Sequence, residues 1–143
     1  MGIEQKQTAL VERFNGISDW EERYREIIQL GRKLPEFPES LRTDTNKVKG
    51  CQSQVWMHAR LNDGTVEFQA DSDAMIVRGL IAILVEVYSG ESPDAILETP
   101  PSFIDDLGLS SHLSQNRANG LSAMIKQMKM YAAAFKALAA RGA

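Results

Sequence analysis

Hydrophobic residues near the N-terminus recur at helical spacing and predict two consecutive helices. Apolar side chains three or four residues apart predict the first helix over about residues 4–14. The second is predicted to start at Ser18, because Ser18 and Glu21 have the spacing of a capping box, and to stop before Pro35. Residues 35–47 show no period, so we expect an extended surface loop there.

The pattern then changes from helical spacing to strict alternation. Residues 54–61 alternate between apolar and polar side chains, residues 65–70 do so again, and Asp63-Gly64 between them is a strong two-residue hairpin turn. If Asn62 pairs with Thr65, apolar residues meet on one face and Arg60 meets Glu67 on the other. A slip of one residue would lose both matches, so the sequence predicts an antiparallel hairpin in this register. Val48 could add a short edge pairing.

The rest of the chain is predicted to be helical. Residues 74–88 are almost entirely apolar, which is typical of a helix inside a domain, and Asp71, Ser72 and Asp73 are its N-cap candidates. Ser92-Pro93 is predicted to begin a short helix. A small turn before Gly108 and a long final helix follow, the latter from residues 114–119 to about residue 140. Its apolar seam is Leu121, Ile125, Met128, Ala132, Phe135 and Ala139.

These elements predict an α+β fold: one domain over residues 1–143, with a small antiparallel β-sheet and helices from both chain ends covering one face. Such a length buries about two-thirds of the surface that the unfolded chain would expose. The net charge of −3, with both signs interspersed, is not typical of nucleic-acid binding. Residues 1–7 are polar and residues 74–88 are too short to span a bilayer, so we expect no membrane association.

The candidate for chemistry is the lone cysteine, Cys51. It cannot form an internal disulfide, and two histidines beside it give no zinc-site spacing, so we expect a reducing, cytoplasmic setting without a bound metal. A lone cysteine is often a small core residue. Its neighbours instead favour an exposed loop with a reactive thiolate, because they are polar or positively charged: Lys47, Lys49, Gly50, Gln52 and Ser53.

Residues 50–56, Gly-Cys-Gln-Ser-Gln-Val-Trp, resemble the signature of the SufE family, and residues 34–38, 70–80 and 117–121 resemble further family segments in the same order. The resemblance implies a SufE/IscU-like fold and a sulfur-transfer partner that is not an autonomous enzyme. Cys51 would accept persulfide sulfur from a SufS-like cysteine desulfurase and relay it to a SufBCD-like iron–sulfur cluster scaffold. Pyridoxal phosphate would belong to the desulfurase, so this chain would need no cofactor of its own.

The same resemblance singles out residues around Cys51. It implies that Arg117 pins the cysteine loop or touches the partner, although an ion pair with Asp71 or Asp73 is an equal alternative. Asp71 and Asp73 are expected to cap their helix, with one of them free to position the loop. Trp56, Met57 and apolar residues near the last helix are candidate shields for Cys51, and Trp56 could equally be an ordinary buried aromatic residue.

Two other functions remain open from the sequence. One is a desulfurase-binding module that activates its partner allosterically, with Cys51 incidental. The other is a cysteine hydrolase, which needs a base in reach of Cys51. His58 lies seven residues further on, roughly 23 Å along an extended strand, and His112 could approach only through the tertiary fold.

Overall fold

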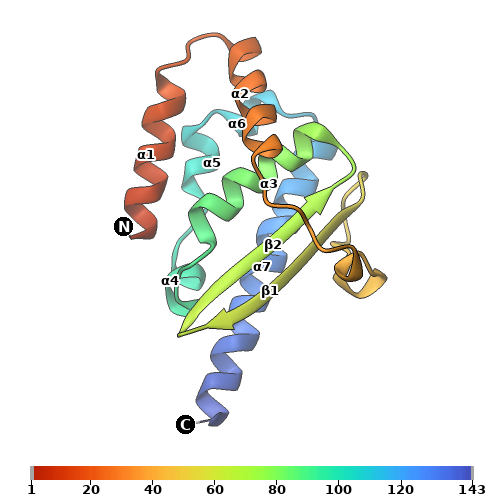
Figure 1. The fold of residues 1–143 in the computed structure, drawn as a ribbon. Helices are drawn as coiled ribbons and strands as arrows, with labels where there is room; N and C mark the ends of the chain where they lie inside the picture. Colours follow the sequence, from red (N-terminus) through yellow and green to blue (C-terminus); the bar gives the residue numbers. More distant parts are fainter. Residues whose placement is uncertain (1, 143) are drawn as a thin grey trace.

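A computed structural model describes residues 2–142, so the ends of the predicted domain, Met1 and Ala143, lie outside the described residues. The chain has the predicted α+β fold, in which one antiparallel hairpin lies against a set of helices (Figure 1). In order, the elements are α1 (Ile3–Asn15), α2 (Trp20–Arg32), the 3-10 turns η1 (Glu39–Leu41) and η2 (Asp44–Asn46), β1 (Val55–Asn62), β2 (Thr65–Ser72), α3 (Met75–Tyr88), α4 (Pro93–Glu98), α5 (Ser102–Asp106), α6 (Leu109–His112) and α7 (Gln115–Gly142).

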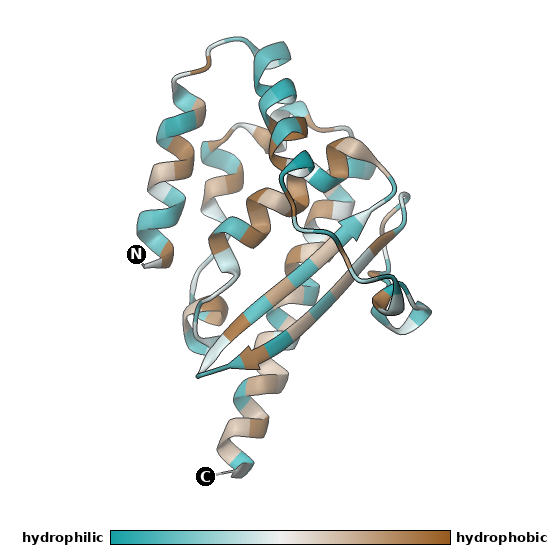
Figure 2. Ribbon diagram, in the orientation of Figure 1, coloured by the Kyte–Doolittle hydropathy of each residue, from teal (hydrophilic) through white to brown (hydrophobic). Residues whose placement is uncertain are grey.

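The hairpin of β1 and β2 has the predicted register. Asn62 pairs with Thr65 and Arg60 with Glu67, whose side chains approach to 2.9 Å. Asp63 and Gly64 have φ angles of 49° and 81°, the positive values that a type I′ turn needs at both central positions. Figure 2 shows hydrophobic and hydrophilic residues alternating along both strands. The hairpin prediction is therefore confirmed.

Helix α3 is the interior helix that its apolar sequence predicts. Helix α2 packs tightly on it, and α1 contacts it as well. At the crossing with α2, a Cβ atom on Gly79 would lie 2.2 Å from the carbonyl oxygen of Ile27, and one on Gly31 would lie 2.6 Å from the Gly79 nitrogen. The two helices thus meet backbone to backbone. Within residues 2–142 no helix is long and apolar enough to cross a membrane.

Two helix starts differ from the prediction. Helix α2 is capped by Asp19, whose Oδ1 accepts a hydrogen bond from the Glu21 amide at 3.1 Å, so the capping box at Ser18 was wrong by one residue. Helix α3 follows Ala74, which has no side-chain cap. Asp71 and Asp73 therefore do not cap α3. Each binds a partner outside the helix, as described below.

The C-terminal half follows the prediction with two differences. Ser92 caps α4, accepting from the Ala95 amide at 3.1 Å. The short helix α6, which the pattern did not reveal, comes directly after Gly108, where φ is +78°. Helix α7 begins within the predicted window and is buried along its seam as far as Ala132. The seam does not reach Ala139, which is exposed because the end of α7 projects past the hairpin (Figure 1).

Residues 35–47 are not simply extended, since they include the two 3-10 turns η1 and η2. Phe37 in this segment is buried, with 5% of its surface exposed. The predicted pairing of Val48 is confirmed: its amide donates to the Val55 carbonyl at 2.9 Å, beside an isolated bridge between Lys47 and Trp56. The end of this segment therefore lies beside the start of β1.

Candidate functional site

Cys51 lies in a six-residue loop, residues 49–54, which we name the Cys51 loop. Gly50 turns the chain at its beginning, with φ at +93°, a value that side-chain-bearing residues rarely adopt. The Val48–Val55 hydrogen bond closes the base of the loop. On the trailing side, the Asp73 Oδ1 accepts from the Gln54 amide at 3.1 Å, and the Asp73 amide donates to the Gln54 carbonyl at 3.3 Å. Asp73 thus holds the loop, in place of the helix cap expected from the sequence.

The tip of the Cys51 loop rests on the N-terminal part of α7. The Cys51 thiol donates to the carbonyl oxygen of Gly120 with an Sγ–O distance of 3.7 Å. The two segments lie close together: a Cβ atom on Gly120 would be in van der Waals contact with Sγ at 3.6 Å, and one on Gly50 with the Cβ of Ala123 at 3.4 Å. Gly120 and Ala123 form the docking surface on α7. Sequence analysis placed residues 117–121 in a family segment and expected shielding near the last helix, but it did not identify these two residues as the surface.

The docked cysteine is a neutral thiol. Cys51 is half-buried and packs against the hydrophobic core, and this burial raises the pKa of its thiol. The expected activation by neighbouring lysines is wrong for this conformation. Lys47 faces Asp44, with a distance of 3.6 Å between Nζ and Oδ1, and desolvation decides the direction of the shift. Burial in the docked position therefore opposes the reactive thiolate that the sequence predicts.

Asp71 belongs to a second cluster, on the outer face of the hairpin. Its Oδ2 accepts from Arg42 Nη2 at 2.6 Å, and its Oδ1 lies 3.0 Å from Arg78 Nε. The Arg42 guanidinium also lies over the rings of Trp56, at 5.0 Å, and Phe37, at 5.3 Å. Trp56 therefore stacks on Arg42, and its predicted role as a shield for Cys51 stays a prediction. Sequence analysis did not identify Arg42 as a partner of Asp71, because an aperiodic loop gives no pattern that predicts a contact 29 residues away.

The remaining predicted residues lie in two places, the Cys51 loop and the start of α7. Gln52 is exposed and Ser53 half-buried in the Cys51 loop. Arg117 is exposed, and within residues 2–142 it forms no ion pair with Asp71 or Asp73, so that alternative is wrong. It lines a small hollow of about 260 Å³ with Tyr24 and His112.

The geometry offers no base for a cysteine hydrolase in the described part of the chain. The His112 ring stacks on Trp20, with centroids 3.8 Å apart, and its Nδ1 lies 2.9 Å from the Gly108 carbonyl oxygen. His58 sits on β1 opposite Gln69. Between residues 2 and 142 there is also no cluster of three or more His, Cys, Asp or Glu residues suited to a metal.

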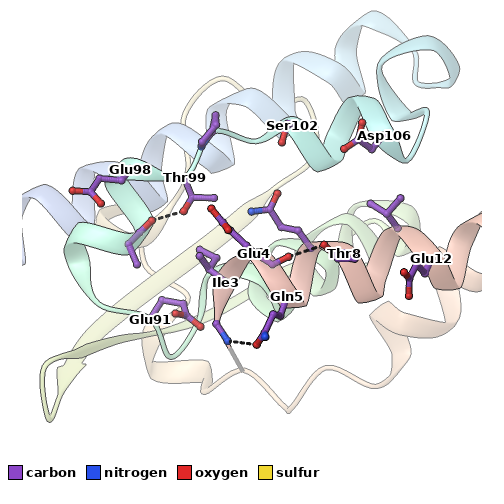
Figure 3. Close-up of a pocket in the computed structure, with 15 residues that line it drawn as sticks. Ile3, Glu4, Gln5, Thr8, Glu12, Glu91, Glu98, Thr99, Ser102 and Asp106 are labelled. Carbon is purple, nitrogen blue, oxygen red and sulfur yellow. Dashed lines mark hydrogen bonds between the residues drawn. The ribbon is translucent and has the colours of Figure 1, made fainter.

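A large hollow of about 1080 Å³ lies elsewhere, between the N-terminal part of α1 and the α4–α5 region (Figure 3). Acidic and neutral polar side chains line it, Glu4, Glu98 and Asp106 among them, and none of the candidate site residues is present. A deep pocket is the usual place for a small-molecule site. The hollow lacks the lone thiol and every other predicted site residue, so we assign the candidate site to the Cys51 loop.

The fold and the site define a small α+β protein with a single thiol. That thiol lies on a loop that turns at Gly50 and docks on α7. The described residues contain no cluster suited to a metal. The chain belongs to the SufE family: the family model described as "SufE: Fe-S metabolism associated domain" matches residues 8–132. Membership associates the chain with iron–sulfur metabolism.

Relatives and a solved structure agree with this assignment. An uncharacterised SufE-like protein of Rhizobium meliloti (strain 1021) is 44% identical over 125 residues, covering 84% of this chain and 89% of the relative. One of Synechocystis (strain PCC 6803) is 42% identical over 127 residues, covering 89% of this chain and 80% of the relative. The solution structure of a hypothetical protein from Thermus thermophilus is similar with a TM-score of 0.76 and 28% identity, covering 94% of this chain and 96% of that one.

Proposed function

We propose that this protein is a sulfur acceptor and activator of a SufS-like, pyridoxal-phosphate-dependent cysteine desulfurase. The observation that carries the proposal is the state of Cys51: a lone thiol, neutral and half-buried while docked, on a loop whose base is fixed independently of its tip. Family membership supports the desulfurase as partner. The pyridoxal phosphate resides on that partner, and a SufBCD-like scaffold is the acceptor downstream. A reducing cytoplasm keeps the lone thiol available.

The transfer is an exchange at sulfur. With the loop undocked, the Cys51 thiol loses its proton to solvent and the thiolate attacks the terminal sulfur of the persulfide on the desulfurase cysteine. A new S–S bond forms on Cys51, the partner's S–S bond breaks, and its electron pair remains on the partner's cysteine as a thiolate. The sulfane sulfur changes carrier without net oxidation or reduction, so the step needs no further cofactor.

Intact mass spectrometry tests this function. After incubation with desulfurase and cysteine, the wild-type chain should gain mass in steps of one sulfur atom, removable by a reductant and located on Cys51. The Cys51→Ser variant should gain none. A wild-type chain that stays unmodified while the desulfurase turns over would reject the acceptor function.

One observation favours a second candidate, an allosteric binding module. Cys51 packs against the hydrophobic core, as an incidental small residue would. Cys51→Ser separates the two functions, because a serine hydroxyl does not take sulfur from a persulfide at neutral pH. Docking contacts change by one atom, so desulfurase binding should persist and stability should fall by no more than about 1 kcal/mol. We expect desulfurase stimulation to be lost; full stimulation by Cys51→Ser would establish the allosteric module.

A further inference from the structure

The two sides of the Cys51 loop are held in different ways. The trailing side is tied to the end of β2 by the paired contacts between Gln54 and Asp73. The leading side, residues 35–48, forms no regular strand, and its backbone joins β1 near the loop through Val48. Side-chain contacts with the hairpin therefore add to this short backbone pairing in holding the segment.

Arg42 supplies such contacts. Its guanidinium donates through Nη2 to Asp71 on β2 at 2.6 Å and through Nε to Glu39 at 2.9 Å. The same group lies 5.0 Å from the ring centroid of Trp56 on β1 and 5.3 Å from that of Phe37. Trp56 and Asp71 are paired across the strands. One side chain thus connects the leading segment to both strands beside the base of the loop.

We propose that Arg42 is a positioning residue that sets the resting position of the Cys51 loop by clamping the leading segment to Trp56 and Asp71. The inference rests on the proposed function of Cys51 as sulfur acceptor, since it concerns how readily that cysteine becomes accessible. Within residues 2–142, the hydrogen bonds, ion pairs and cation–π contacts of Arg42 involve neither Cys51 nor a residue of α7. The clamp acts by holding the fixed end from which the loop departs, so its loss increases the population of undocked loop.

An arginine suits this position better than a lysine. A planar guanidinium can lie over aromatic rings while its edge donates to carboxylates, whereas an ammonium group is a compact charge that cannot do both in the same way. Asp71 keeps Arg78 as a partner, 3.0 Å away, when Arg42 is replaced. The buried carboxylate is then still opposed by a positive charge, and we expect variants at residue 42 to fold.

The test measures the rate at which iodoacetamide alkylates Cys51 in the free protein. Arg42→Met should react about fivefold faster than wild type, the factor that corresponds to losing one cation–π contact of ordinary strength. Arg42→Lys should fall between the two. The matched control is Arg60→Met, which removes another arginine–carboxylate pair from the same face of the hairpin, next to the turn, and should react at the wild-type rate.

Wild-type alkylation rates in both Arg42 variants would overturn the inference, and so would an equal acceleration in Arg60→Met. Urea unfolding midpoints separate loop opening from general loosening, because only the latter accelerates alkylation in step with lost stability. If Arg42→Met does not fold, the alkylation rate of Arg42→Lys, which keeps the positive charge, tests the inference by itself.

The response to the desulfurase adds a readout that a structural defect would not produce. A larger undocked population lowers the concentration of Arg42→Met needed for half-maximal stimulation, while the final amount of sulfur loaded stays that of wild type. A misfolded variant would instead load less sulfur. If wild type itself gains no sulfur, the proposed function fails, whereas the alkylation rates still decide whether Arg42 positions the loop.

Discussion

At the scale of single residues, the chemistry of this protein depends on where Cys51 is. Docked on α7, the thiol donates to the Gly120 carbonyl and its pKa is raised by burial. Undocked, it has no such burial and ionises as an ordinary cysteine does. Burial and the Gly120 contact therefore oppose ionisation of the docked thiol, and under the proposed function the loop must undock before Cys51 can act as a nucleophile.

This raised pKa predicts the pH dependence of thiol reactivity. An acid with a raised pKa holds its proton more tightly in the folded state, so its contribution to docking is complete below the pKa of the unfolded chain and is lost as pH rises through the folded value. Alkylation rates of Cys51 in the native protein should therefore inflect at a higher pH than in urea-unfolded protein. Identical inflections would show that burial does not govern the thiol.

At the scale of elements, the crossing of α2 and α3 allows a sharp test. Gly79→Ala places a Cβ atom 2.2 Å from the Ile27 carbonyl oxygen, which belongs to the backbone and cannot turn away. The two helices must separate, and we expect a loss of about 3 kcal/mol in the free energy of unfolding, measured by urea denaturation.

The matched control for that change is Gly16→Ala. Gly16 has φ at −73° and its nearest new contact would be at 3.5 Å. Alanine fits there, so stability should rise by up to about 1 kcal/mol through the unfolded state. Equal effects at the two positions would contradict the close crossing.

The sequence predicted those elements whose partners are near in the chain. The hairpin register could be predicted because its paired residues, such as Arg60 and Glu67, lie close in the sequence on either side of the same turn. The assignment of Asp71 and Asp73 as helix caps failed because stronger partners, Arg42 and the Gln54 amide, come from distant segments. The docking of Cys51 on Gly120 spans 69 residues and depends on close backbone approach, which no local pattern encodes. Family resemblance pointed to Cys51 and to residues 117–121, but not to the contact between Cys51 and Gly120.

At the scale of the whole molecule, the hairpin and helices share one hydrophobic core, which extends from Leu10 on α1 through Met57 on β1 to Ala132 on α7. The two tryptophans report on different parts of it: Trp20 stacks on His112 among the helices, and Trp56 lies on the hairpin. If the chain is a single domain, each should detect the same unfolding event.

We therefore expect one cooperative transition in urea. In Trp20→Phe, the fluorescence of Trp56 should follow the same curve as the far-ultraviolet circular dichroism of that variant, and Trp20 should do the same in Trp56→Phe. Separate midpoints for fluorescence and dichroism within one variant would show that the hairpin and the helices unfold independently.

The fixed base of the Cys51 loop determines how fast the loop can open. Because the Val48–Val55 and Gln54–Asp73 contacts hold both ends, only residues 49–54 move when the tip leaves α7, and motions of short loops take nanoseconds to microseconds. Productive encounter of two proteins is far slower at cellular concentrations. If the chain accepts sulfur as proposed, the loop will have opened and closed many times before a desulfurase arrives. The frequency of meeting that partner, and not the speed of opening, would then limit how often Cys51 collects sulfur.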